Sequence, residues 1–299
     1  MTGEKEMKVS IVIPTYYRSK DLTELFDSLL RQSVKPFEVI VVDDTPTDAI
    51  KNVCEEYCGK FRELGIKLIY IRNQREPSLT IARNIGVNMA KGDIILFLDS
   101  DVILYPDYIE KCLEVFEVKK NALGAQGWYS AASRVRRRTL YLRNPLRKLF
   151  FLGYLAENSC KIFGYPYVLT EIVNCESMSG CNMAYKREVF EELELKFDEN
   201  LKRYSYMEDM LFSHSLHKMR PNSLYITPYA KLIHKWSKEG RTERRNNLLS
   251  ETQYMRSCRK YVLMKLFGIR GLFIFFMQTI GLILFGIIRK IQGKSSFSK

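Results

Sequence analysis

Histidine is scarce in this sequence, and its cysteines form no metal-binding pattern. The chain has three histidines and seven cysteines in 299 residues. His214 and His217 stand three apart, as a zinc pair would, but the rest of a zinc ligand set is missing. An odd number of cysteines without metal spacing favours a reducing compartment over a disulfide framework. The sequence therefore argues against a zinc module and against a disulfide-stapled secreted protein.

Internal repeats, low-complexity segments and a signal peptide are also missing from the sequence. Residues 1–8 are polar, and the first apolar run after them has the pattern of a strand. We therefore expect one large domain with an appendage, without a secretory leader.

The net charge of +13 is unevenly distributed. Arginines between Arg134 and Arg147 alternate with aromatic and aliphatic residues, as in segments that bind anionic membrane surfaces. Nucleic-acid binding is the competing interpretation, but no recognised RNA or DNA module accompanies the charge. We expect a membrane surface as partner and no nucleic acid.

The carboxyl end carries a long apolar run. Residues 271–288 contain no charged side chain, and as a helix they would span about 27 Å, just short of a bilayer core. A single crossing would place Arg289 and Lys290 on the side away from the nucleotide sugars, against the positive-inside tendency. A hairpin and an in-plane helix therefore stay open, and we expect only a membrane-associated helical tail.

Strand and helix patterns alternate through the first 120 residues. Apolar runs predict strands at 9–13, 37–42 and 66–71 and a fourth that ends at Asp99, with Pro14 stopping the first. Apolar stripes at helical spacing separate them. This alternation predicts an α/β fold, a Rossmann-like α/β/α sandwich with a mostly parallel central sheet.

Carboxylates and aromatic residues collect where these strands end. Asp99 and Asp101 would face the same side of an extended chain, and a Mg²⁺ or Mn²⁺ ion between them would offset their repulsion. A solvated pair in a turn is the plainer alternative, but the carboxyl end of an inner strand is where such sheets bind ligands. Of Asp43 and Asp44, only one can face a ligand, beside Tyr16; the alternative is a helix cap.

Further motifs follow in a fixed order along the chain. The set comprises Val-Ser-Ile-Val-Ile-Pro-Thr-Tyr (9–16), Val-Ile-Val-Val-Asp-Asp (39–44), Ala-Arg-Asn-Ile-Gly (82–86), Phe-Leu-Asp-Ser-Asp (97–101), Ser-Gly-Cys-Asn-Met (179–183) and Met-Glu-Asp-Met-Leu-Phe (207–212). Each motif alone is weak, but the ordered set resembles the family 2 glycosyltransferases with the GT-A fold. The resemblance covers residues 8 to about 236.

The resemblance implies a donor site at the strand ends. Pro14, Tyr16 and Asp44 would hold the nucleoside. Arg83 and Asn84 would help to shape the nucleotide pocket, although Arg83 could equally be a structural ion-pair partner.

The resemblance also implies a metal site and a general base. Asp101 would bind a divalent ion directly, Asp99 would touch the ion or the ribose, and His234 would be a third ligand. Asp209 would take the proton from the acceptor hydroxyl, and Glu208 would orient it or bind the acceptor. The alternative for this acidic pair is charge that stabilises a helix amino terminus.

Taken together, the resemblance implies a metal-dependent inverting glycosyltransferase. It would move a sugar from a nucleotide-diphosphate donor, with a UDP-sugar favoured, to a lipid-linked saccharide or polysaccharide on the cytoplasmic side of the cell membrane. The predicted units are a donor-binding half (1–130), a basic insertion (131–170), an acceptor-binding half (171–240) and a basic linker with a membrane-associated tail (241–299). The alternatives are a nucleotide-sugar-binding scaffold without turnover and a nucleotidyltransferase.

Overall fold

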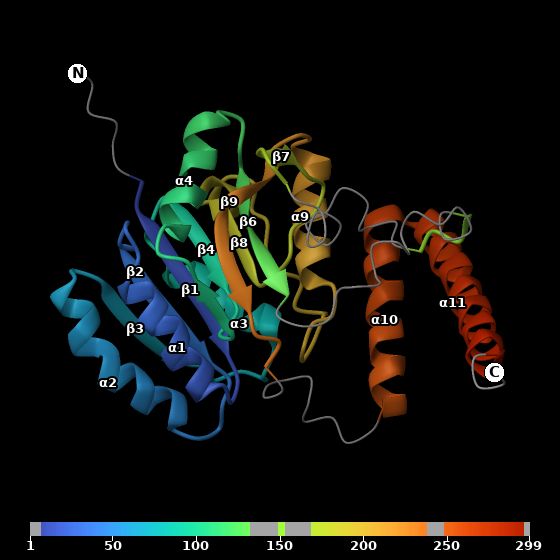
Figure 1. Cartoon of the computed structure of the whole chain (residues 1–299), viewed down its shortest axis with the longest axis horizontal. Helices are drawn as coiled ribbons and strands as arrows, with labels where there is room; N and C mark the ends of the chain where they lie inside the picture. Colours follow the sequence, from blue (N-terminus) through green and yellow to red (C-terminus); the bar gives the residue numbers. More distant parts are fainter. Residues whose placement is uncertain (1–6, 132–148, 153–168, 238–247, 296–299) are drawn as a thin grey trace.

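A computed structural model describes residues 7–131, 149–152, 169–237 and 248–295 (Figure 1). Most of the predicted basic insertion, including Arg134 to Arg147, lies outside the described residues. So does the segment 238–247, where the predicted linker begins.

The amino-terminal half alternates strands and helices as the sequence predicts. Its elements are β1 (Val9–Thr15), α1 (Ser19–Leu30), β2 (Glu38–Asp43), α2 (Ala49–Glu63), β3 (Lys67–Arg72), α3 (Leu79–Met89) and β4 (Ile94–Leu98). The four strands are parallel, in the order β3-β2-β1-β4. One detail differs from the prediction: β1 continues through Pro14, which pairs with Val42, because proline ends a strand only where its missing N–H is needed.

The second half makes the sheet mixed, so the predicted mostly parallel sheet is wrong. It contributes β5 (Val102–Leu104), α4 (Tyr108–Val118), β6 (Gly124–Ala131), β7 (Val173–Asn174), β8 (Asn182–Lys186), α8 (Glu188–Glu191), α9 (Glu208–Met219) and β9 (Leu224–His234). Among the described residues the order continues β4-β8-β6-β9-β5, with β7 also on β9. β8 is antiparallel to β4 and β6, and β5 is antiparallel to β9.

Both faces of the sheet are buried, which explains the nearly continuous apolar runs. Alternate residues of β1 belong to different clusters: Ile11 and Ile13 pack with Phe26 of α1, whereas Val12 packs with Phe97. Such two-sided burial is typical of parallel strands covered by helices. The strand ends are therefore held by a rigid framework.

Two further helices follow the sheet domain (Figure 1). Helix α10 (Leu248–Phe267) packs on α9, and α11 (Ile269–Ser295) packs on α10. Between them Gly268 adopts φ 58°, a left-handed conformation that glycine accepts without strain. In the described part of the chain, no helix is both long enough and apolar enough to cross a membrane.

Candidate active site

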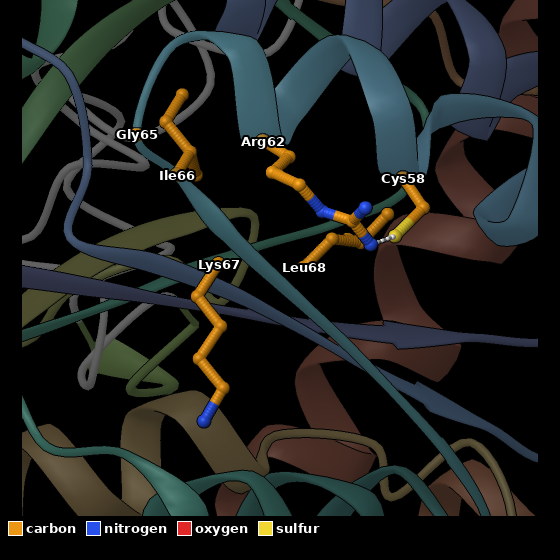
Figure 2. A pocket seen from close by; sticks show the side chains of 6 residues that line it. All are labelled: Cys58, Arg62, Gly65, Ile66, Lys67 and Leu68. Carbon is orange, nitrogen blue, oxygen red and sulfur yellow. Dashed lines mark hydrogen bonds between the residues drawn. The ribbon is translucent and has the colours of Figure 1, made fainter.

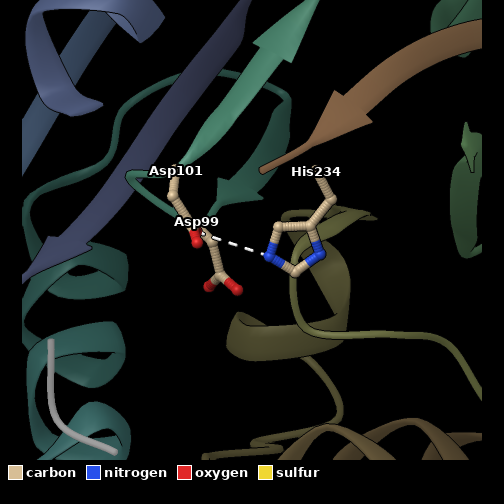
Figure 3. Close-up of side chains that lie close together, drawn as sticks. All are labelled: Asp99, Asp101 and His234. Carbon is tan, nitrogen blue, oxygen red and sulfur yellow. Dashed lines mark ion pairs between the residues drawn. The ribbon is translucent and has the colours of Figure 1, made fainter. Parts of the chain in front are cut away.

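The predicted metal ligands Asp99, Asp101 and His234 meet at the end of β4 (Figure 3). One ligand atom from each lies within 4.8 Å of the others, and Nε2 of His234 is 3.4 Å from Oδ1 of Asp101. The extended geometry expected for the two carboxylates is wrong, because β4 ends at Leu98 and residues 99–101 form a turn. His234 is the last residue of β9 and lies opposite Val102 in the antiparallel pair of β9 and β5. This pairing brings it next to the two aspartates.

The charges of this cluster are strongly coupled. Burial opposes ionisation of Asp101, but His234 and Arg18 hold the pKa of its carboxyl below the usual value. Burial would lower the pKa of His234, yet its hydrogen bonds to Asp101 and Cys181 raise that pKa to about 10. For Asp99, burial and the charge of Asp101 outweigh Arg83 and raise the pKa. In this state Asp101 is an anion held between two cations.

Arg18 is a site residue that the sequence did not reveal. Its guanidinium lies 2.8 Å from Oδ1 of Asp101, and it also donates to the carbonyl of Ser237 at 3.3 Å. The amide of Ser237 donates to Oδ2 of Asp101 at 3.0 Å. A lone arginine after a strand carries no local signal of this contact, since its partner is distant in the chain.

The donor set fits a hard divalent cation. Asp99 and Asp101 supply carboxylate oxygens, and Nε2 is the ring nitrogen of the buried His234 that faces Asp101 (Figure 3). Carboxylate with imidazole suits Mn²⁺, and carboxylate oxygens suit Mg²⁺. The ring centroids of His214 and His217 are 5.7 Å apart, but within the described residues these histidines belong to no group of three possible metal ligands.

The nucleoside side of the site separates the two neighbouring aspartates. Asp43 is fully buried; it accepts hydrogen bonds from the amide of Thr45 at 2.7 Å and the hydroxyl of Tyr70 at 2.9 Å. It therefore shapes the turn and does not cap α2. Asp44 keeps a small exposure, and the half-buried Tyr16 follows Thr15, whose carbonyl accepts from the amide of Asp44. Pro14, which is buried, directly precedes Thr15.

Arg83 is a buried centre that connects both halves of the site. It is 1% exposed, forms an ion pair with Glu208, and donates to the carbonyl of Gly180 at 2.9 Å. Its guanidinium also lies 3.7 Å from Asp99. The ion-pair interpretation of Arg83 is therefore confirmed. Contact with a nucleotide stays a prediction.

Asn84 shapes the neighbouring loop. Its amide donates to the carbonyl of Phe197 at 2.9 Å and to Glu199 at 3.0 Å, and its oxygen accepts from the amide of Phe197 at 3.0 Å. The side chain thus fixes the segment that leads toward α9.

Asp209 and Glu208 open α9 inside the site. Oδ2 of Asp209 accepts from the amide of Gly180 at 2.9 Å, and Oδ1 accepts from its neighbour Met210 at 2.8 Å. Both acids are buried, at 8% and 5% exposure. The two acids lie in the first turn of α9, as the helix-terminus interpretation expects, and their catalytic role stays a prediction.

Burial raises the pKa of Glu208 to about 7. Arg83 opposes this shift, and the adjacent Asp209 carboxylate adds to it. Two neighbouring carboxyls whose environments differ are a common arrangement in acid–base sites.

The segment before α9 is conformationally unusual. Arg203, Ser205 and Met207 adopt φ values of 59°, 52° and 69°. Each left-handed non-glycine residue costs about 1 to 2 kcal/mol. Hydrogen bonds hold the segment, for example from the amide of Leu79 to the carbonyl of Arg203 at 2.9 Å.

A distinct surface hollow lies away from this site. It has a volume of about 310 Å³, and Figure 2 shows its lining where α2 ends and β3 begins. That is the amino end of β3, whereas the acidic cluster lies at the carboxyl end of β4. We therefore place the candidate active site at the acidic cluster, because of the chemistry of its side chains, and not at the hollow.

Comparisons with known proteins agree with this arrangement. The sequence pattern described as Glycosyl transferase family 2 matches residues 10–194, which is more than half of the chain. The glycosyltransferase GlyA of Streptococcus pneumoniae is 27% identical over 198 residues, which cover 64% of this chain and 26% of GlyA. The chain thus spans about a quarter of that curated relative.

Solved structures share the fold. TarS 1–349 of S. aureus in complex with UDP-GlcNAc has a TM-score of 0.60 at 16% identity, over 87% of this chain and 66% of that one. The mannosyltransferase PcManGT of Pyrobaculum calidifontis, in complex with GDP-Man and Mn²⁺, has a TM-score of 0.59 at 14% identity, over 99% and 81%. With an α/β, GT-A-like architecture and the matching sequence pattern, the chain belongs to glycosyl transferase family 2.

Proposed function

We propose that this enzyme transfers a sugar from a nucleotide-diphosphate donor to an acceptor hydroxyl, with inversion and with a divalent ion. The observation that carries the proposal is the connection of Asp209 to the acidic cluster through Gly180 and Arg83. One end of this network offers a base, and the other offers the ligands for a diphosphate-bound ion.

Asp99, Asp101 and His234 would hold the ion, which would neutralise charge on the departing diphosphate. Asp44 and Tyr16, which directly follow β2 and β1, would hold the nucleoside. Relatives solved with UDP-GlcNAc and with GDP-Man carry different bases. A UDP-sugar is our choice, because TarS, which is also a sequence relative, is solved with UDP-GlcNAc, and a carboxylate such as Asp44 can accept the N3–H of uracil.

Asp209 supplies the base in this proposal. The amides of Gly180 and Met210 donate to the two carboxylate oxygens of Asp209. It would accept the proton of the hydroxyl as that oxygen attacks the anomeric carbon from the face opposite the leaving group. Its two amide donors fix the direction of the carboxylate without a side-chain rearrangement.

The acceptor in this proposal is a lipid-linked saccharide or polysaccharide at the cytoplasmic face of the membrane. The sequence relative TarS is named a poly(ribitol-phosphate) β-N-acetylglucosaminyltransferase, and it is 39% identical over 35% of this chain and 17% of its own length. We propose a polymeric surface acceptor for this chain because the name of TarS gives a polymer as its acceptor.

Product analysis tests the proposal against its alternatives. The purified protein is incubated with Mn²⁺, a panel of nucleotide sugars and an acceptor-containing membrane extract, with Asp209→Asn as the matched control. Nucleoside diphosphate release that requires acceptor and Asp209 supports transfer. Pyrophosphate release from a nucleoside triphosphate and a sugar phosphate would identify a nucleotidyltransferase, and donor binding without turnover would identify a scaffold.

A further inference from the structure

Helix α11 exposes a continuous apolar stripe on one side. Its members recur at intervals of three, four and seven residues and are between 51% and 80% exposed: Ile269, Phe273, Phe276, Ile283 and Ile287. Such spacing places them on one face of a helix. Exposed apolar patches of this kind mark surfaces that bind a partner.

The opposite face of α11 is held by the protein. Ile274 and Phe275 are buried against α10, and a side chain at Gly271 would meet the carbonyl of Leu263. Figure 1 shows α10 between α9 and α11, so that α11 is the outermost of these helices. The stripe therefore faces away from the sheet domain as a result of packing, and α11 is not a loosely attached tail.

The end of the basic sequence stretch packs beside the stripe. Gln278 donates to the carbonyl of Phe151 at 2.8 Å, and the rings of Phe151 and Phe273 are 6.0 Å apart. A side chain at Gly281 would meet Phe150 at 2.6 Å. Residues 149–152 thus connect the arginine-rich sequence before them directly to α11.

The charge around the stripe has a single sign. Along α11 itself, from residue 269 to 295, the sequence has no Asp or Glu, and it has basic residues at Arg270, Arg289, Lys290 and Lys294. An apolar helix face flanked only by cations matches the interface of a bilayer with anionic headgroups. A protein partner would not require the complete lack of carboxylates.

We infer that the α11 stripe and residues 149–152 form one docking surface that lies in the plane of an anionic lipid interface. The apolar stripe enters the headgroup boundary, and the flanking basic residues contact the lipid phosphates. The helix does not need to cross the bilayer in this arrangement.

This surface is connected through the packing of α10 to α9, the helix that carries Asp209. Val262 and Leu266 of α10 belong to the same cluster as Met210 and Leu211, which follow Asp209 directly. The hydroxyl of Tyr261 also donates to Asp198 at 2.8 Å. Docking of α11 would therefore set the orientation of α9 relative to the lipid. That consequence rests on the proposed function, whereas the docking itself does not.

Vesicle flotation of the full chain tests the surface. We compare phosphatidylcholine vesicles with vesicles that also contain phosphatidylglycerol, using wild type and the double variant Phe276→Ser/Ile283→Ser. The wild type should float with the anionic vesicles, and the variant's partitioning should fall about tenfold or more, because two half-exposed apolar side chains no longer enter the interface. High salt should weaken wild-type binding.

The matched control is Val118→Ser/Met89→Ser, which removes apolar residues that are 65% and 43% exposed on α4 and α3. It should float like the wild type. Far-UV circular dichroism and calorimetric donor binding should be unchanged in both variants, which separates this test from the donor chemistry. Equal flotation of stripe variant and wild type would overturn the inference, as would wild type that floats with neither vesicle. A wild-type dimer that the stripe variant dissociates, without vesicle binding, would assign the stripe to self-association and also overturn it.

Discussion

The backbone of Gly180 joins Asp209 to the buried Arg83: its amide donates to Asp209 at 2.9 Å and its carbonyl accepts from Arg83 at 2.9 Å. A Cβ at this position would lie 2.7 Å from Nη2 of Arg83 and 3.0 Å from Oε1 of Glu208. A side chain larger than that of glycine would therefore displace Arg83 or Glu208.

Gly180→Ala should misplace Arg83 and Glu208 and lower kcat/KM about tenfold or more, because small displacements in a catalytic constellation are costly. It should also destabilise the protein by about 1 to 3 kcal/mol through overpacking. The control is Gly59→Ala on α2, where no atom lies within 4 Å; it should stabilise by about 0.5 to 1 kcal/mol. Steady-state kinetics and urea unfolding measure both. Wild-type kinetics for Gly180→Ala would contradict the positional role.

Asp209→Asn should abolish transfer while it spares donor binding. The amide retains the shape of the side chain but cannot take the proton, so we expect a loss on the order of 10²-fold or more in kcat. Calorimetry with donor and Mn²⁺ should give a wild-type affinity. Transfer within a few-fold of wild type would remove Asp209 as the base and direct attention to Glu208.

Asp101→Asn should weaken Mn²⁺-dependent donor binding sharply. The variant loses the charge that faces Arg18 and His234, and a carboxamide is a poorer ligand for a hard cation. Asp107→Asn, an exposed aspartate before α4 without a side-chain cap bond, is the matched control. Calorimetric titration of donor with and without Mn²⁺ provides the measurement. An unchanged metal-dependent affinity would contradict the assignment of Asp101 as a metal ligand.

Glu208 should make stability depend on pH near neutrality. Its pKa is raised from 4.5 to about 7, so its contribution to stability is fully present below about pH 4.5 and is lost as pH rises through about 7. Wild type should lose up to about 3 kcal/mol over this window relative to Glu208→Gln. Urea unfolding at several pH values measures the difference in slope, which is independent of the constant cost of leaving Arg83 unpaired. Parallel pH profiles would contradict the prediction, because they would show that the pKa of Glu208 is the same in the folded and the unfolded protein.

The amino-terminal half was predictable because its signals are local. Helix stripes such as Leu22, Leu25 and Phe26 and buried runs such as Ile94–Leu98 each fall within one element. The direction of β8 and β9 was not predictable, because an apolar run has the same composition in either orientation. Strand direction is set by pairing between residues that are distant in the sequence, such as Leu98 of β4 with Asn182 of β8.

Pairing also explains what the sequence could and could not reveal about the site. Asp99 and Asp101 were identified by their place after a strand, although a turn brings them together. Asn182 of the Ser-Gly-Cys-Asn motif is fully buried and donates to the carbonyl of Gly127 at 3.0 Å, a contact between distant segments that the motif does not reveal. Arg18 was missed because its ion pair depends on how a loop folds over Asp101.

The three left-handed residues before α9 have a consequence for engineering and for evolution. Substitution of Arg203, Ser205 or Met207 by glycine or asparagine would relieve backbone strain, so stability-guided selection would favour such changes. The same changes would widen the range of paths by which the chain can enter α9. A search for thermostable forms of this enzyme should therefore leave this short segment fixed, because it sets the direction in which the chain enters α9.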